Sequence, residues 1–315
     1  MMSKISVVVT VYNEEENILP LVEQITSALK GMDYEIIYVD DGSRDRTVEV
    51  IRSITDTRLH LIVFKKNYGQ SSALAAGIDY ATGDFIVTLD GDLQNDPADI
   101  PGMIRVAEEG DFDMVTGVRI NRKDDFFIRK IPSFIANRII MKATGVKIKD
   151  NGCALKVFRS DLAKSLGLYG EMHRFIAVLA ALEGARITQV DVQHHPRIHG
   201  KSKYGLSRTL KVISDLLLLT FNKKYLQRPM HFFGKWGFLI LLAGIVINIY
   251  MLILKIEGHD IWGKPLLLLG ILLVIAGFQL ITTGIIAELQ MRTYFESQNK
   301  KPYRIRNIFR GGRQA

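Results

Sequence analysis

Two long apolar stretches near the C-terminal end of the 315-residue chain restrict its fold more than any other feature. Residues 232–254 contain a single charged side chain, Lys235, and residues 265–287 contain none. A helix of about 20 apolar residues is long enough to cross the hydrocarbon of a bilayer. Each stretch therefore predicts a transmembrane helix, and a hydrophobic content of 48% agrees with a membrane portion.

Charge is divided unevenly along the chain. Residues 1–195 carry 23 Lys and Arg against 28 Asp and Glu, whereas residues 196–315 carry 18 against 5. Each basic group beside an anionic leaflet contributes about 1 kcal/mol, so this pattern favours a membrane over nucleic acid as partner. Basic residues flank the two spans, while their connector has only Lys255 and Lys264. The positive-inside rule, with no visible signal peptide, predicts a multi-pass protein of the inner (cytoplasmic) membrane with its catalytic domain and both termini in the cytoplasm.

The region before the spans alternates strand and helix patterns. The runs that predict strands are residues 5–11, 34–39, 59–64 and 85–90. The intervening runs that predict helices are residues 15–30, 46–54 and 67–80. Such alternation indicates an α/β domain with a parallel sheet that binds ligands at the carboxyl ends of its strands. No glycine-rich phosphate loop is present, so a diphosphate here would be held by a metal and basic side chains.

Two carboxylates, Asp90 and Asp92, stand at the end of the fourth predicted strand. In a tight turn both can converge on one hard cation, and Mg²⁺ or Mn²⁺ accepts one or two carboxylates together with substrate phosphate oxygens. An isolated acidic cluster with a glycine more often forms a solvated turn. Two further motifs, at 9–14 and 38–43, precede this one in the chain, and their order favours the metal site.

Three motifs in order carry a resemblance to a known family. Val-Thr-Val-Tyr-Asn-Glu at 9–14, Tyr-Val-Asp-Asp-Gly-Ser at 38–43 and Asp-Gly-Asp-Leu-Gln-x-x-Pro at 90–97 resemble the signature of glycosyltransferase family 2, in particular its polyprenyl-phosphate glycosyltransferases. The resemblance implies a GT-A-like (Rossmann-like) domain with a mixed, mostly parallel sheet. It also implies a nucleotide site at Thr10, Tyr12, Glu14, Asp40 and Asp90, and a metal and diphosphate site at Asp90, Asp92 and Gln94. Taken alone, Tyr12 also fits strand-end packing, and Glu14 fits a charge at a helix N-terminus.

The resemblance extends to the acceptor. Arg119, Arg129 and Ser133 match family positions that resemble acceptor-phosphate ligands. Arg129 and Ser133 are four residues apart, so on a helix they would share a face and present a guanidinium and a hydroxyl to one phosphate. A solvated, charged loop is the alternative.

The turn at 150–153 holds the candidate catalytic base. Many relatives have a carboxylate just after the glycine of this turn, where this chain has Cys153, and the nearest carboxylate is Asp150. Asp150 is therefore either a catalytic residue or an Asx-turn residue. A phosphate monoester is already anionic near neutral pH, so the reaction does not require a base. Cys153, the only cysteine, is expected to be a packed thiol.

The last predicted strand spans residues 187–192. A basic loop that begins at His194 follows it. Its three histidines lack a carboxylate or thiol that would complete a typical zinc site. The loop resembles the R-x-x-G-x-S-K-Y segment of the family, which implies that it binds a phosphate through Arg197, Ser202, Lys203 and Tyr204. The segment after it, 206–221, has the spacing of an amphipathic helix, which would lie on a membrane surface or against a protein core.

The predicted reaction is an inverting, metal-dependent transfer of a hexose from a nucleotide sugar to undecaprenyl phosphate or a similar polyprenyl phosphate. UDP-glucose is the donor expected by analogy alone, with GDP-mannose or a modified UDP-sugar as alternatives. A processive polysaccharide synthase is disfavoured because residues 290–293 do not supply a Q-x-x-R-W motif. A non-enzymatic membrane scaffold is disfavoured because it would not need the ordered acidic motif.

The expected organisation has four parts, and a dimer or tetramer through the membrane anchor is expected. The parts are a GT-A-like catalytic domain at 1–205, an interfacial segment at 206–231, two transmembrane helices within 232–291, and a basic cytoplasmic tail at 292–315.

Overall fold

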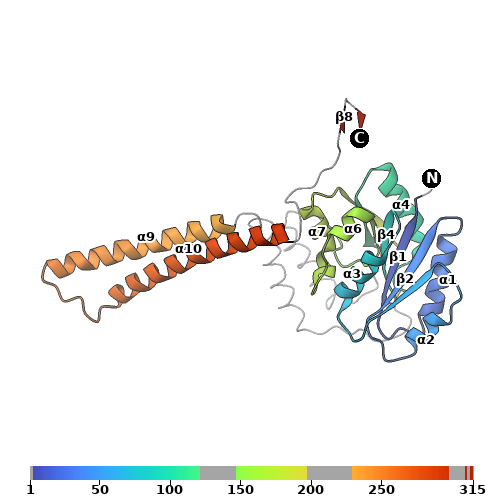
Figure 1. Cartoon of the computed structure of the whole chain (residues 1–315), viewed down its shortest axis with the longest axis horizontal. Helices are drawn as coiled ribbons and strands as arrows, with labels where there is room; N and C mark the ends of the chain where they lie inside the picture. Colours follow the sequence, from blue (N-terminus) through green and yellow to red (C-terminus); the bar gives the residue numbers. More distant parts are fainter. Residues whose placement is uncertain (1–2, 121–146, 197–228, 298–308, 311–312, 315) are drawn as a thin grey trace. The chain divides into compact units, whose positions relative to one another are not determined.

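The computed structural model describes residues 3–120, 147–196, 229–297, 309–310 and 313–314. The chain divides into two compact units, Met1–Leu216 and Leu217–Ala315 (Figure 1). The predicted interfacial segment falls largely outside the described residues. Each unit is described separately below.

The first unit is built on a seven-stranded sheet in the order β3-β2-β1-β4-β6-β5-β7. Only β6 runs against its neighbours, β4 and β5, so the sheet is mixed and mostly parallel, as predicted. The strands are β1 (Ile5–Val11), β2 (Tyr34–Asp40), β3 (Leu59–Val63), β4 (Phe85–Asp90), β5 (Met114–Arg119), β6 (Lys156–Arg159) and β7 (Ile187–Val192).

Helices connect these strands, and several are shorter than the sequence pattern predicts. The predicted helix at 67–80 begins only at Gln70, because Gly69 before it has a φ of 93°. The helices are α1 (Ile18–Ala28), α2 (Thr47–Arg52), α3 (Gln70–Tyr80), α4 (Ile100–Glu109), α6 (Ser160–Ser165) and α7 (Ile176–Leu182), with short 3-10 helices η1 (Pro97–Asp99) and η3 (Met172–Phe175).

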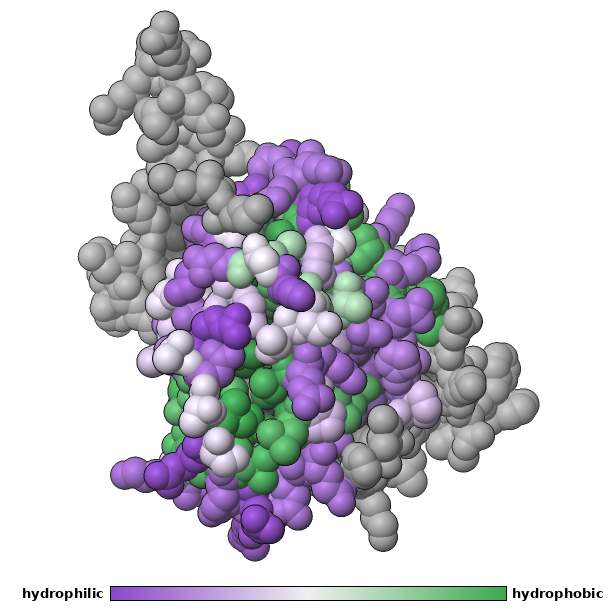
Figure 2. All heavy atoms as spheres, turned by 90° about the vertical axis from the view of Figure 1, so that its right-hand side faces the viewer, coloured by the Kyte–Doolittle hydropathy of each residue, from purple (hydrophilic) through white to green (hydrophobic). Residues whose placement is uncertain are grey.

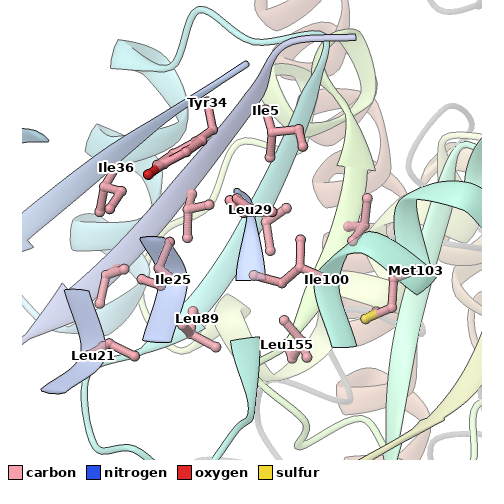
Figure 3. Close-up of a cluster of buried hydrophobic side chains, with 14 of the residues drawn as sticks. Ile5, Leu21, Ile25, Leu29, Tyr34, Ile36, Leu89, Ile100, Met103 and Leu155 are labelled. Atoms are coloured by element: carbon pink, nitrogen blue, oxygen red, sulfur yellow. The ribbon is translucent and has the colours of Figure 1, made fainter. Parts of the chain in front are cut away.

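Alternation along β1 separates the two faces of the sheet. Val7 and Val9 belong to the main core. This core also contains Leu21 and Ile25 of α1, Leu29 just after that helix, and Ile100 and Met103 of α4 (Figure 3). Val8 points to the other face, where a Cβ at Gly77 of α3 would lie 2.3 Å from its Cγ1 atom. Burying each large aliphatic side chain contributes about 1.5–3 kcal/mol, so this core holds the sheet against α1 and α4. The face of the unit seen in Figure 2 is largely hydrophilic.

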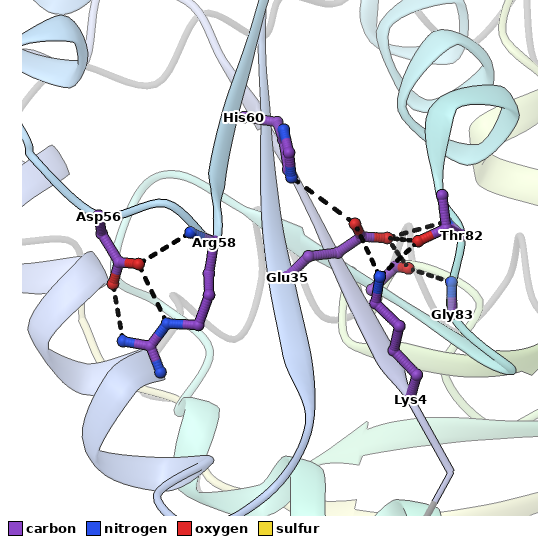
Figure 4. Close-up of polar contacts among 8 residues, drawn as sticks. Lys4, Glu35, Asp56, Arg58, His60, Thr82 and Gly83 are labelled. Carbon is purple, nitrogen blue, oxygen red and sulfur yellow. Dashed lines mark hydrogen bonds and ion pairs between the residues drawn. The ribbon is translucent and has the colours of Figure 1, made fainter.

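A polar network fastens the amino ends of the strands. Glu35 of β2, 5% exposed, accepts hydrogen bonds from Ser6 Oγ at 2.6 Å and from the backbone N and Oγ1 of Thr82 at 2.8 and 2.9 Å (Figure 4). Lys4 Nζ lies 3.4 Å from the same carboxylate. Because Ser6 and Glu35 are register partners, the network ties β1 to β2 at the edge opposite the carboxyl ends.

The second unit contains two long apolar helices, α9 (Pro229–Ile256) and α10 (Pro265–Ser297). Both are long and apolar enough to cross a membrane, with hydropathies of 2.6 and 2.4. They extend beyond the predicted spans of 232–254 and 265–287, since a helix can continue past the hydrocarbon into its polar flanks. Two-residue strands, β8 (Phe309–Arg310) and β9 (Arg313–Gln314), pair near the C-terminus.

Glycines allow α9 and α10 to pack closely. A Cβ at Gly277 would lie 2.5 Å from the backbone N of Leu241, and one at Gly244 would lie 2.7 Å from that of Val274. Small residues let helix backbones approach in this way within a bilayer. Many of the remaining large apolar side chains of both helices are exposed, as expected for surfaces that face lipid.

Candidate functional site

Thr10, Asp40 and Asp90, three residues predicted to bind the nucleotide, stand at the carboxyl edge of the sheet. In the strand register, Val11 stands beside Asp40, and Thr10 stands beside Asp90. Parallel strands bring their carboxyl ends to one edge, so the ends of β2, β1 and β4 form a continuous row. This row is the edge at which the sequence predicts that ligands bind.

The turn after β4 has a shape that the sequence requires. Gly91 donates its backbone N–H to the Thr10 carbonyl at 3.2 Å, and a Cβ there would lie 2.5 Å from Val11 Cγ1. Leu93 has a φ of 59°, a left-handed conformation that costs roughly 1–2 kcal/mol outside glycine. Its side chain is 5% exposed and belongs to the core, which holds the residue in this conformation. The buried leucine thus fixes the backbone between Asp92 and Gln94.

The electrostatics at Asp90 fit a divalent cation. Burial and the neighbouring charge of Asp92 raise the pKa of Asp90 to about 7, although Lys156, Arg119 and a 2.7 Å hydrogen bond from Gln70 act in the opposite direction. A divalent cation would offset this repulsion, and carboxylate oxygens are its preferred ligands. No cluster of three His, Cys, Asp or Glu side chains that could hold a metal occurs in the described part of the chain.

Asp40 is suited to accept a hydrogen bond from a ligand. The residue is fully buried, and its Oδ2 atom accepts from the backbone N–H groups of Gly42 and Ser43 at 3.1 and 3.0 Å. Its Oδ1 atom is also buried and receives no hydrogen bond from the residues that the structure describes. An unfilled buried acceptor costs about 1–3 kcal/mol, so a ligand N–H or O–H there would be stabilising.

Asp41, which the sequence analysis did not single out, anchors a neighbouring loop. Its carboxylate accepts from the backbone N–H groups of Tyr68 at 2.7 Å and Gly69 at 2.9 Å. A Cβ at Gly42 would lie 2.6 Å from the carbonyl carbon of Lys66, so the two loops touch. The two adjacent aspartates therefore have different surroundings, which the Asp-Asp-Gly-Ser motif alone does not separate.

The structure gives Glu14 a local role. Its Oε2 atom accepts from Asn17 Nδ2 at 2.6 Å, just before α1, and its backbone N–H donates to Thr47 Oγ1 at 3.0 Å. Glu14 lies four residues before the first residue of α1, and no acidic residue stands in the first turn of that helix. Tyr12, one residue beyond β1, is half-buried. Nucleotide contacts by either residue stay predictions.

Arg119 and Asp150 form a bidentate ion pair. Arg119 Nε and Nη2 donate to the two carboxylate oxygens of Asp150 at 2.7 and 2.8 Å. Asp150 Oδ1 also accepts from the Gly152 N–H at 3.2 Å, which is the Asx turn considered from the sequence. A predicted phosphate ligand and a predicted catalytic residue are thus bonded to each other, which the sequence analysis did not foresee.

Cys153 has the surroundings of a packed thiol. It is fully buried and free, and burial raises its pKa. Reactive cysteines have lowered pKa values and some exposure, so this one is not a nucleophile. The buried ammonium of Lys156, at the start of β6, donates to the Cys153 carbonyl.

The segment before the basic loop is attached to the acidic motif. His195 donates its backbone N–H to the Gln94 carbonyl at 2.8 Å. His194 forms an isolated antiparallel β-bridge with Asn95. The side chain of His195 lies 3.3 Å from that of Asp96. Six predicted ligands lie outside the described residues: Arg129, Ser133, Arg197, Ser202, Lys203 and Tyr204.

A cavity of about 80 Å³ adjoins Asp90. Its lining includes four polar side chains that the sequence analysis missed: Gln70, Lys156, His173 and Arg174. His173 and Arg174 come from η3, a short element with no motif of its own.

Comparison with known proteins agrees with this geometry. Residues 6–167 match the family described as glycosyl transferase family 2. The chain belongs to glycosyltransferase family 2. This family 2 glycosyltransferase is 44% identical over 99% of its length to the dodecaprenyl-phosphate galacturonate synthase of Rhizobium johnstonii, covering 95% of that protein. It is 34% identical over 97% of its length to the undecaprenyl-phosphate 4-deoxy-4-formamido-L-arabinose transferase of Yersinia pestis, covering 93%. The resemblance to polyprenyl-phosphate glycosyltransferases is therefore confirmed.

Solved structures confirm the fold. The glucosyl-3-phosphoglycerate synthase of Mycobacterium tuberculosis, in complex with Mn²⁺, UDP-glucose and phosphoglyceric acid, matches 70% of this glycosyltransferase and 79% of its own chain. The TM-score is 0.54 and the sequence identity is 16%. At that identity the likeness establishes the GT-A-like architecture alone.

Proposed function

We propose that the protein transfers a hexose from a nucleotide sugar to a polyprenyl phosphate at the cytoplasmic leaflet of the membrane. The observation that carries the proposal is the row of Asp40, Asp90 and Asp92, with an unfilled buried acceptor beside two mutually repelling carboxylates. Two relatives that match almost the whole chain, both named for sugars on polyprenyl phosphates, support the acceptor class. The apolar helices α9 and α10 support a lipid substrate.

In the proposed reaction, an oxygen of the acceptor phosphate attacks the anomeric carbon of the donor. A new carbon–oxygen bond forms as the bond to the leaving nucleoside diphosphate breaks, so the anomeric configuration inverts. A divalent cation, Mg²⁺ or Mn²⁺, held by Asp90 and Asp92 would offset charge on the departing diphosphate. Gln94 lies beside this pair, and Asp40 accepts a hydrogen bond from the nucleoside. The acceptor phosphate is already anionic, so no proton has to be removed before attack.

The acceptor side uses basic residues. Arg119 is held in position by Asp150, and Arg129, Ser133 and the loop from Arg197 to Tyr204 are proposed to bind the lipid phosphate. Two anions must approach each other in this site, so cations would reduce their repulsion and hold them in line. Asp150 then acts by holding Arg119.

The proposed donor is a UDP-sugar. UDP-glucose is the expectation by analogy, and the names of the two relatives indicate that modified sugars belong in any test. The proposed topology places the catalytic unit and both termini in the cytoplasm, with α9 and α10 as a two-span anchor, and a dimer or tetramer through this anchor.

The test is transfer of radiolabel from a panel of UDP- and GDP-sugars to undecaprenyl phosphate, using the full chain in detergent with and without Mg²⁺ or Mn²⁺. We expect label in the lipid phase that requires the metal and that falls at least about a hundredfold in Asp92→Asn, as for loss of a transition-state ligand. Asp161→Asn, an exposed carboxylate on α6, is the matched control and should keep its activity. Absence of transfer from every donor, or full activity in Asp92→Asn, would refute the proposal. A long polymer as product would indicate a processive synthase instead.

A further inference from the structure

Gln70, the first residue of α3, contacts a proposed metal ligand in the wall of the cavity. Its Nε2 atom donates to Asp90 Oδ1 at 2.7 Å. Both residues line the cavity, and both are half-buried. A carboxylate only accepts hydrogen bonds, so the amide must direct an N–H group, and not its oxygen, at Asp90. The contact therefore joins the start of α3 to the end of β4.

The two carboxylate oxygens of Asp90 have different surroundings. Oδ1 accepts from Gln70, and within the described residues no other hydrogen bond reaches this carboxylate. Oδ2 is not one of the enclosed side-chain oxygens, which leaves it accessible to a ligand. Because one oxygen is bonded to a helix residue, the carboxylate cannot rotate freely, and the direction of the other oxygen is set.

The start of α3 is itself anchored. Ser71, the next residue, is fully buried. Its Oγ atom accepts the backbone N–H of His173 at 3.0 Å and lies 2.8 Å from Nδ1 of the same residue. Further along the helix, a Cβ at Gly77 would lie 2.3 Å from Val8 Cγ1, so α3 packs directly on the sheet. These contacts fix the backbone from which the Gln70 side chain reaches Asp90.

An amide at position 70 holds the carboxylate without neutralising it. Asp90 and Asp92 repel each other, and a divalent cation would be attracted by the charge that both carry. A lysine at position 70 would also donate to Asp90, but its own charge would compete with the cation for the same carboxylate. Hydrogen bonds from an outer shell orient metal ligands, and their loss lowers metal affinity by about 10–100-fold.

We propose that Gln70 is a positioning residue for the cation site: its neutral amide fixes Oδ1 of Asp90 so that Oδ2 and Asp92 can bind one divalent cation. The inference rests on the proposed function, because it takes Asp90 as a metal ligand. In this role Gln70 touches neither the cation nor the nucleotide. Removing its amide should therefore weaken the contribution of the metal and leave the binding of a nucleotide without metal unchanged.

The test measures nucleotide binding rather than transfer. Equilibrium dialysis of labelled UDP against the full chain in detergent gives the Kd of UDP at a fixed Mn²⁺ concentration and in EDTA, and the ratio of the two is the tightening by Mn²⁺. Gln70→Met keeps the length of the side chain but removes the donor, so it should reduce this tightening by about tenfold or more. Its Kd for UDP in EDTA should stay at the wild-type value. Gln24→Met, the same substitution at an exposed position of α1, is the matched control and should change neither quantity.

Gln70→Lys is the second variant, because it keeps a donor beside Asp90 but adds a charge. It should also lose the tightening by Mn²⁺, since the ammonium competes with the cation. Its unfolding temperature without metal should not fall below that of wild type. A folded variant with impaired metal binding separates the proposed role from a general loss of structure.

The inference is overturned if Gln70→Met keeps the wild-type tightening. It is also overturned if the affinity of Gln70→Met for UDP falls equally with and without Mn²⁺, as expected for a residue that contacts the nucleotide itself. A wild-type chain whose affinity for UDP does not depend on Mn²⁺ would refute the proposed metal site and this inference with it. Absence of transfer alone would refute the proposed function, while the dialysis experiment would still decide the role of Gln70.

Discussion

The sequence left open whether Asp150 is a catalytic residue. Its ion pair with Arg119 allows an experiment that distinguishes a general base from a residue that only positions Arg119. Both carboxylate oxygens are bonded to the guanidinium at 2.7 and 2.8 Å, and the two side chains are 14% and 8% exposed. Removing one partner of a buried pair costs about 3–5 kcal/mol. Asp150→Asn keeps an oxygen for the Gly152 N–H, so a loss of about 3 kcal/mol is expected. For a unit of this size that corresponds to a fall in Tm of about 6–12 °C.

A double-mutant cycle on the transfer reaction distinguishes the roles. If Asp150 only holds Arg119, then Asp150→Asn, Arg119→Gln and the double variant should lower kcat/KM by similar factors, because the second change removes nothing further. If Asp150 is a general base, Asp150→Asn should cost about 10²–10⁴-fold on its own. That loss should persist in the Arg119→Gln background.

The pH profile of kcat/KM is the second measurement. A holding role predicts that Asp150→Asn lowers the profile without changing its acidic limb, whereas a catalytic base would remove that limb. Asp161→Asn serves again as the exposed control. Additive losses in the cycle, together with a missing acidic limb, would refute our assignment of Asp150 as a positioning residue.

Three further outcomes follow from close contacts and buried charge. Gly91→Ala should lower stability by about 1–3 kcal/mol and reduce transfer, because its Cβ would lie 2.5 Å from Val11. Gly102→Ala, inside α4 with nothing within 4 Å, should keep its activity and should raise stability slightly, because alanine favours a helix over glycine by about 1 kcal/mol. Glu35→Gln should lower the free energy of unfolding at pH 7 by about 2 kcal/mol without affecting kcat per folded molecule. Burial raises the pKa of Glu35, but hydrogen bonds from Ser6 and Thr82 and the charge of Lys4 outweigh it and hold the pKa below its usual value. Its stabilisation is therefore present above the unfolded pKa and lost as pH falls through the lower folded pKa, so unfolding curves of wild type and variant should converge in acid; a gap that persists there would contradict this. Gly277→Leu should separate α9 from α10 and lower the Tm in detergent, whereas Ala276→Leu, on the exposed side of α10, should not.

The part of the candidate site at the ends of β1, β2 and β4 could be predicted because these strands are evident in the sequence. β1, β2 and β4 are continuous apolar runs, and in a parallel sheet their ends must meet. The register places Thr10 beside Asp90 and Val11 beside Asp40, at the edge where the sequence predicts a nucleotide and a metal. The unfilled oxygen of Asp40 could not be predicted, because it depends on which backbone N–H groups the Gly42 turn directs at the carboxylate.

The part of the candidate site formed by Arg119, Asp150, Lys156 and η3 was harder to predict, because its contacts join residues that are distant in sequence. β6 has only four residues, too few for a periodic pattern, and its antiparallel direction has no local signature. Arg119 and Asp150 are 31 residues apart, and each matched a different functional role when considered alone. η3, which supplies two residues of the cavity, is a single short turn.

The antiparallel direction of β6 brings the part of the site at Arg119, Asp150 and Lys156 to the edge where β1, β2 and β4 end. A strand parallel to β4 would begin at the far edge of the sheet and carry Lys156 away from Asp90. Because β6 runs antiparallel, its first residue pairs with Thr88, and the turn at 150–153 lies at the carboxyl edge beside the acidic motif. β5, which precedes β6 in the chain and runs in the direction of β4, ends with Arg119 at the same edge, where Asp150 binds it. One short strand thus brings Lys156 and the turn that holds Arg119 to the edge of the sheet where Asp90 stands, which suits the proposed reaction between two phosphate-bearing substrates.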